Sequence, residues 1–75
     1  MRHLGIDVHA KTSELCEVSA QRKATRRERF ATNRETYRRR FESAPRCRVV
    51  MECGGSTPWI ARPLTSFGHE VVVVN

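Results

Sequence analysis

The chain has 75 residues, of which 39% are hydrophobic and 29% charged, and its formal net charge is +6 at pH 7. This length gives one small domain and excludes a two-domain enzyme. The longest uncharged run, residues 53–61, is too short and too polar to cross a bilayer, and the first residues lack the apolar core of a signal peptide. We therefore expect a cytoplasmic protein with no membrane partner.

The first part of the chain predicts an antiparallel meander of three strands, at residues 3–8, 14–19 and 24–30. Alternation places Leu4 and Ile6 inward in the first strand, and Cys16 and Val18 inward in the second. The third strand is so charged that only an edge position would tolerate it. The turn at residues 20–23 contains no glycine, so the register of the second hairpin is weakly specified.

The positive charge is clustered rather than spread. Residues 22–40 carry nine basic side chains against two glutamates, a net +7, and the rest of the chain sums to −1. Such a cluster favours a polyanionic partner, although a solvated charged face remains the alternative. The nucleic-acid-binding surface that we predict consists of Arg22, Lys23, Arg26, Arg27, Arg29, Arg38, Arg39 and Arg40.

A helix is predicted within the second half of this segment. Thr32 and Glu35 match a capping box, in which each side chain satisfies a backbone donor of the other residue. Tyr37 and Phe41 fall on one helical stripe that would be buried, while the arginines at 38–40 face away.

The remaining elements are a strand, a helix and a strand. Residues 48–53 are mostly apolar, which suits a strand covered on both faces. The helix that follows the loop at 54–58 stops at Gly68, and Pro63 should kink it or cost it about 3 kcal/mol. Residues 71–74 predict a last strand with an exposed apolar edge, for which we expect self-association.

The element order βββαβαβ predicts an α/β fold with a mixed five-stranded sheet of order 3-2-1-4-5. If the first and fourth strands are parallel neighbours, their ends lie about 4.8 Å apart and Asp7 and Glu52 converge there. Two such carboxylates share a cation most readily, and the preferred ion is Mg²⁺ or Mn²⁺. The alternative is that Asp7 caps the turn with Thr12 or Lys11, and that Glu52 pairs with an arginine.

The three cysteines include no C-x-x-C pair, so free thiols are expected. A zinc site built from Cys47, Cys53, His69 and either His3 or His9 would have irregular ligand spacing, and we do not expect one.

Three motifs together resemble a known family: GIDVHAK at residues 5–11, MECGG at 51–55 and GHEVVVVN at 68–75. Nearly the whole chain resembles the N-terminal part of the DEDD-type, RuvC-like transposases of bacterial insertion sequences (the insertion sequence one-ten family), a group described as RNA-guided recombinases. The resemblance implies that residues 1–75 form a truncated RNase H-like domain. The implied partners are DNA and a guide RNA.

The resemblance also implies an acidic tetrad that binds Mg²⁺ or Mn²⁺ for DNA strand cleavage and transfer. Asp7 matches the first acid and Glu52 the second, whereas the third and fourth acids and the nucleophilic serine belong to later parts of the family. Lys11 matches a common lysine that could contact a phosphate. We therefore expect the 75-residue chain alone to be inactive in cleavage.

Two other functions remain open. The chain could be a non-catalytic, nucleic-acid-binding remnant that retains only its arginine-rich surface. It could instead be the N-terminal lobe of an actin-like or sugar-kinase ATPase, which also opens with a Gly-x-Asp strand and a meander. That class needs a glycine-rich phosphate loop after the aspartate, and residues 8–11 contain no glycine.

Overall fold

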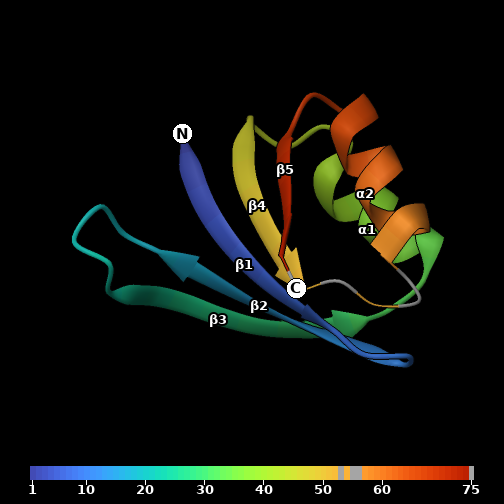
Figure 1. Cartoon of the computed structure of the whole chain (residues 1–75), viewed down its shortest axis with the longest axis horizontal. Helices are drawn as coiled ribbons and strands as arrows, with labels where there is room; N and C mark the ends of the chain where they lie inside the picture. The colour runs from blue at the N-terminus through green and yellow to red at the C-terminus, as the bar shows by residue number, and fades with distance from the viewer. Residues whose placement is uncertain (53, 55–56, 75) are drawn as a thin grey trace.

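The chain folds into a mixed five-stranded sheet of order β3-β2-β1-β4-β5 with two helices, as predicted (Figure 1). The computed structural model describes residues 1–52, 54 and 57–74. The strands are β1 (Arg2–Val8), β2 (Thr12–Val18), β3 (Ala24–Ala31), β4 (Cys47–Glu52) and β5 (Glu70–Val74), and the helices are α1 (Arg34–Phe41) and α2 (Thr57–Ser66).

The central strand β1 joins two kinds of pairing. It pairs antiparallel with β2, which pairs antiparallel with β3, so the predicted meander is confirmed. On its other side β1 pairs in parallel with β4, and β4 pairs in parallel with β5. Both helices lie on the same face of this sheet (Figure 1). We call the other face the open face, because no helix of the described residues covers it.

The buried face of the meander differs from the prediction in its second strand. Leu4 and Ile6 are buried as expected, but β2 buries Ser13 and Leu15 instead of Cys16 and Val18. The reason is the register, in which Ile6 lies directly opposite Leu15. Residues that lie directly opposite in an antiparallel pair share a face of the sheet.

Strand β4 is covered on one face only, which corrects the expectation of a strand buried on both sides. Its residues alternate between buried and exposed, with Cys47, Val49 and Met51 buried. Both crossover helices lie on that same side of the sheet, and Val50 remains exposed on the open face. The strand ends at Glu52, and the predicted last position, Cys53, lies outside the described residues.

Helix α1 begins one residue later than the capping box predicted. Asn33 is the N-cap, and its side-chain oxygen accepts a hydrogen bond from the Thr36 backbone N–H at 2.8 Å. The Thr32 hydroxyl is instead hydrogen-bonded to the Ser13 hydroxyl at 2.6 Å. Thr32 therefore ties the start of the helix to β2.

Helix α2 contains Pro63 in its interior and continues past it to Ser66. The helix ends at Ser66, two residues before the predicted stop at Gly68, where the backbone has a φ of 96°. There the His69 N–H donates to the Leu64 carbonyl at 3.1 Å, which satisfies one of the last carbonyls of the helix. Glycine is favoured at Gly68 because side chains disfavour positive φ.

The turn between β2 and β3 also uses a positive φ, but without glycine. Arg22 has a φ of 63°, and its N–H donates to the Ser19 carbonyl at 2.9 Å. The register of the two strands shifts between Glu17 and Val18. The turn without glycine thus accompanies an irregular hairpin, as the sequence indicated.

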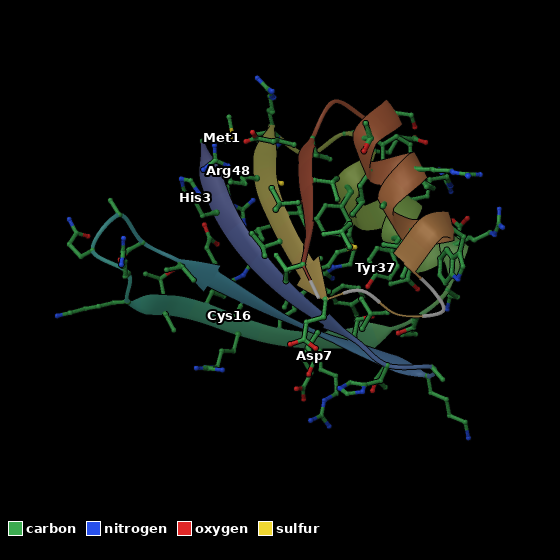
Figure 2. The ribbon with its side chains drawn as sticks, viewed as in Figure 1. Met1, His3, Asp7, Cys16, Tyr37 and Arg48 are labelled. Carbon is green, nitrogen blue, oxygen red and sulfur yellow. The ribbon has the colours of Figure 1, made fainter. Side chains whose placement is uncertain are left out.

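The core centres on Tyr37, which is only 2% exposed and lies between the sheet and the helices (Figure 2). Its ring centroid is 5.1 Å from that of Phe30, 5.9 Å from that of Phe41 and 6.0 Å from that of Trp59. Its hydroxyl donates to the Ser13 hydroxyl at 2.6 Å. One side chain therefore connects β2, β3, α1 and α2.

Burial raises the pKa of Tyr37, and the hydrogen bond to Ser13 partly opposes this. The unfolded chain exposes the phenol, which then ionises at a pH of about 10. Above that pH the unfolded state loses a proton that the folded state keeps, so the free energy of unfolding should fall as the pH rises. Because Tyr37 is the only tyrosine, tyrosinate absorbance measured during alkaline unfolding should appear together with unfolding.

The matched variant is Tyr37→Phe, which keeps the ring and removes the hydroxyl. It should lower the free energy of unfolding at neutral pH by about 1 kcal/mol, because Ser13 loses its donor. In urea titrations at several alkaline pH values, this variant should lose stability less steeply than the parent protein. Tyrosinate forming in the folded protein near the ordinary pKa would contradict the assignment.

Candidate functional site

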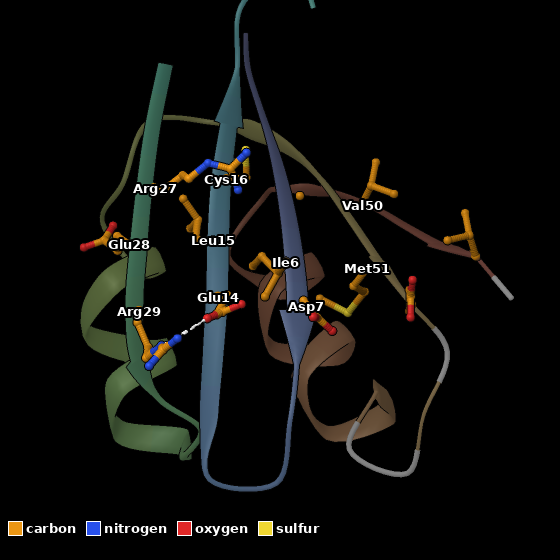
Figure 3. Close-up of a pocket in the computed structure, with 13 residues that line it drawn as sticks. Ile6, Asp7, Glu14, Leu15, Cys16, Arg27, Glu28, Arg29, Val50 and Met51 are labelled. Atoms are coloured by element: carbon orange, nitrogen blue, oxygen red, sulfur yellow. Dashed lines mark hydrogen bonds and ion pairs between the residues drawn. The ribbon is translucent and has the colours of Figure 1, made fainter. Parts of the chain in front are cut away.

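The carboxyl ends of β1 and β4 bring two carboxylates to the same edge of the sheet. The parallel register runs to the pair Ile6 and Met51, and the next residue on each strand is Asp7 or Glu52. Adjacent strands lie about 4.8 Å apart. Both acids line one shallow hollow of the open face (Figure 3). We predicted that Asp7 and Glu52 converge if β1 and β4 are parallel neighbours, and the two strands do pair in parallel.

Asp7 also has a neighbour on its other side. It lies directly opposite Glu14 of β2. Figure 3 shows Asp7 and Glu14 next to each other in the hollow, with Glu14 bound to Arg29 of β3. The Arg29 Nε donates to a Glu14 carboxylate oxygen at 3.1 Å. Glu14 is thus engaged by a guanidinium, whereas the carboxylate of Asp7 faces the hollow without an arginine partner among the described residues.

Asp7 is held by His9 rather than by the turn residues that the alternative proposed. The His9 Nε2 lies 3.0 Å from the Asp7 Oδ2, so the ring nitrogen donates to the carboxylate. Both side chains are more than half exposed, at 60% for His9 and 55% for Asp7. A polar contact this exposed contributes little to stability, so it leaves Asp7 available to a ligand.

The donor set suits a single hard cation. Mg²⁺ binds proteins through one or two carboxylates and completes its shell with water and substrate phosphates, which Asp7 and Glu52 would allow. Within residues 1–52, 54 and 57–74, no group of three or more histidine, cysteine, aspartate or glutamate side chains is placed to hold a metal ion. The described residues therefore fit one weakly held ion and provide no complete cage.

Gly5 of β1 lines the hollow and contributes no side chain to it. A Cβ atom built on Gly5 would meet only the Cys16 carbonyl oxygen, at 3.9 Å. Gly5 lies between Cys16 and Val50 in the sheet. The fold would thus accommodate a side chain at position 5. Because Gly5 has none, another group can approach the backbone there.

The predicted basic surface does not form one continuous patch. Arg22 and Lys23 lie in the β2–β3 turn, whereas Arg27 and Arg29 line the hollow of the open face. Five of the eight residues form ion pairs with glutamates: Arg26 and Arg40 with Glu28, Arg29 with Glu14, Arg38 with Glu35 and Glu42, and Arg39 with Glu35. Among the described residues, Arg22, Lys23 and Arg27 have no carboxylate partner.

Arg40 corrects the expectation that all three arginines at 38–40 face away from the sheet. Its guanidinium carbon lies 4.5 Å from the centroid of the Phe30 ring, and it forms an ion pair with Glu28 of β3. Its Nε is buried and has no hydrogen-bond partner. Arg40 therefore belongs to the contact between α1 and the sheet rather than to an exposed surface.

By contrast, Arg38 and Glu35 pair on the exposed side of α1, where the Arg38 guanidinium lowers the pKa of Glu35.

Lys11 lies exposed in the turn between β1 and β2. Its backbone carbonyl accepts the Thr32 N–H at 2.9 Å, which anchors the turn to the segment before α1. The side chain is therefore presented to solvent from a fixed backbone, close in sequence to Asp7.

The sequence did not reveal the environment of His69, which is 3% exposed. Its Nδ1 accepts the Cys47 N–H at 3.2 Å, and its Nε2 donates to the Phe41 carbonyl at 2.7 Å. The Cys47 sulfur is 3.4 Å from Nδ1. Both ring nitrogens are thus used within the fold, which leaves no lone pair for zinc. Cys53 lies outside the described residues.

In the part of the chain that the structure describes, no helix is long and apolar enough to cross a membrane. No protein-family model matches the sequence, and no curated protein matches it significantly.

Proposed function

We propose that the chain is the N-terminal part of an RNase H-like, metal-dependent DNA recombinase of the DEDD, RuvC-like transposase type. In this proposal Asp7 and Glu52 are the first two acidic metal ligands. The observation that carries it is their position at the ends of adjacent parallel strands, where both line one hollow.

The topology supports the same proposal. A three-stranded antiparallel meander followed by two parallel strands, in the order 3-2-1-4-5, is what this fold requires. The first acid would then lie on the central strand, next to the second acid. Strands that end at a common edge are where α/β sheets bind their ligands.

Each residue around such a site would have a separate role. Asp7 and Glu52 would hold Mg²⁺, which when bound supplies Lewis-acid stabilisation of a phosphate oxygen. His9 donates to the Oδ2 atom of Asp7 and thereby orients this carboxylate. Gly5 lines the hollow without a side chain, and Arg27, which also lines it, supplies positive charge for a phosphate backbone.

Mn²⁺ titration of isotopically labelled protein tests the metal site. Paramagnetic broadening should begin at the amide signals around Asp7 and Glu52. The variant Asp7→Asn should weaken Mn²⁺ binding by about tenfold or more, because one of the two carboxylates is lost. The control is Glu42→Gln, which removes the same charge from the C-cap of α1, where Glu42 pairs with Arg38.

Broadening that starts elsewhere, or that persists unchanged in Asp7→Asn, would contradict the assignment of the site.

Nuclease assays complete the test. Two-metal phosphoryl transfer needs more carboxylates than these two, so the 75-residue chain should cleave no DNA at any Mg²⁺ or Mn²⁺ concentration. Cleavage that disappears in Asp7→Asn would show that another chain supplies the missing acids.

A second candidate function, nucleic-acid binding without catalysis, is favoured by the cations that lack carboxylate partners. Arg22 and Lys23 in the turn and Arg27 on β3 can contact phosphates without first breaking an ion pair. Arg38 and Arg39 would have to give up their contacts with Glu35. Binding should therefore depend on the β2–β3 hairpin more than on α1.

Salt-dependent binding of labelled DNA, followed by fluorescence anisotropy, tests this ranking. Replacing Arg22 and Arg27 with glutamine should lower the magnitude of the salt slope by about two, which is one unit for each lost phosphate contact. The matched control replaces Arg38 and Arg39 with glutamine and removes the same charge. Equal slopes for the two double variants would mean that only net charge matters.

A further inference from the structure

Strand β5 lies at an edge of the sheet and lacks the features that usually prevent an edge strand from pairing with another strand. Among the described residues it pairs with β4 alone, so the backbone groups of its other side face outward. After Glu70 the strand consists of valines at residues 71–74 and has no charge and no proline. Such an edge readily accepts another strand.

The opposite edge of the same sheet is protected. Strand β3 carries four consecutive charged residues at 26–29, and its pairing with β2 is irregular near the turn. Charged side chains and irregular pairing are the devices by which natural sheets discourage association at an edge. One molecule thus has one protected and one unprotected edge, which indicates that β5 has a partner.

The apolar surface continues from this edge onto the open face. Val50 lies next to Val72 in the register, and these two side chains are 38% and 39% exposed. Val74 is 41% exposed on the same face, whereas Val73, opposite the buried Met51, is 44% exposed on the helix side. Pairing at the β5 edge would cover part of each exposed valine of β5 and would satisfy the outward-facing backbone groups.

The charge distribution favours a second copy of this chain as the partner. The basic segment lies around β3, four strand spacings or about 19 Å from β5. Two copies joined at β5 would hold their basic edges about 40 Å apart, far beyond a Debye length of about 8 Å. A like-charged pair of molecules can therefore associate at this edge with little repulsion.

Antiparallel pairing also brings no strong charge repulsion to the ends of the strand. The carboxyl end of the sheet carries Asp7 and Glu52, whereas the other end carries Arg46 and Arg48 beside Glu70. The Arg48 Nε donates to the Glu70 carboxylate at 2.6 Å. About a two-fold axis at Val72, Glu70 of one copy lies opposite Val74 of the other, two strand spacings or about 10 Å from Glu52. The arginines and acids on the two β4 strands lie about 14 Å apart, so charges across the seam interact weakly.

We propose that β5 pairs antiparallel with β5 of a second copy about a two-fold axis at Val72, which joins both sheets into one. The two open faces then become continuous, with the valines of both copies side by side. A self-complementary edge and two-fold symmetry are the features of the commonest protein dimers. This inference is independent of the proposed metal site.

Sedimentation equilibrium of the 75-residue protein, across micromolar to millimolar concentrations, tests the proposal with two lysine variants. Val72→Lys places a charge on the edge and should raise the dissociation constant of the dimer at least about tenfold. The control is Val50→Lys, which alters an equally exposed valine of the same face on β4, away from the edge. Its dissociation constant should change much less, and circular dichroism checks that both variants fold.

A second measurement uses the unaltered protein. In a mixture of labelled and unlabelled chains, isotope-filtered NOE spectra should show contacts between residues 71–74 of one copy and the same residues of the other. Three results would overturn the proposal: a monomer at all concentrations, a dimer that survives Val72→Lys, or equal disruption by Val50→Lys. Equal disruption would indicate that the open faces stack instead.

Discussion

The burial of Tyr37 beneath both helices is the constraint on which the arrangement of this small fold depends. Its ring contacts aromatic rings from β3, α1 and α2, and its hydroxyl must find a partner because it lies out of reach of water. Ser13 of β2 supplies that partner. Since Tyr37 belongs to α1 and its ring contacts Trp59 of α2, both helices lie on the same face, and the other face remains open for Asp7 and Glu52.

Much of the fold could be predicted from the sequence because its strongest local signals agree with one another. The alternation at Leu4 and Ile6, the stripe of Tyr37 and Phe41, and the end of α2 within two residues of Gly68 each match the structure. The strand order followed from the element order, since a charged third strand must lie at an edge and a crossover helix implies parallel neighbours.

The errors in prediction came from contacts between distant segments. Alternation alone does not decide which face of β2 is buried. The buried face carries Ser13, a polar residue that a hydropathy pattern assigns to solvent. In the same way Thr32 fits a helix cap locally, but Ser13 competes for its hydroxyl. Arg40 was expected in solvent, yet its long side chain gains more by lying on Phe30 beside Glu28. The parallel pairing of β1 with β4, which places Asp7 and Glu52 at the ends of adjacent strands, needed only the strand order and was predictable. The His9 contact needed the turn geometry and was not.

The positive φ of Arg22 has a consequence for the order in which the chain folds. For a residue with a side chain this conformation costs about 1–2 kcal/mol relative to glycine. In the unfolded ensemble, the β2–β3 hairpin should therefore close about tenfold less often than a hairpin with glycine at this position. Local hairpins otherwise form among the earliest contacts of a folding chain. We expect the β1–β2 hairpin, whose turn includes the His9 N–H to Thr12 carbonyl bond of 3.0 Å, to form first and to act as the template on which β3 later aligns.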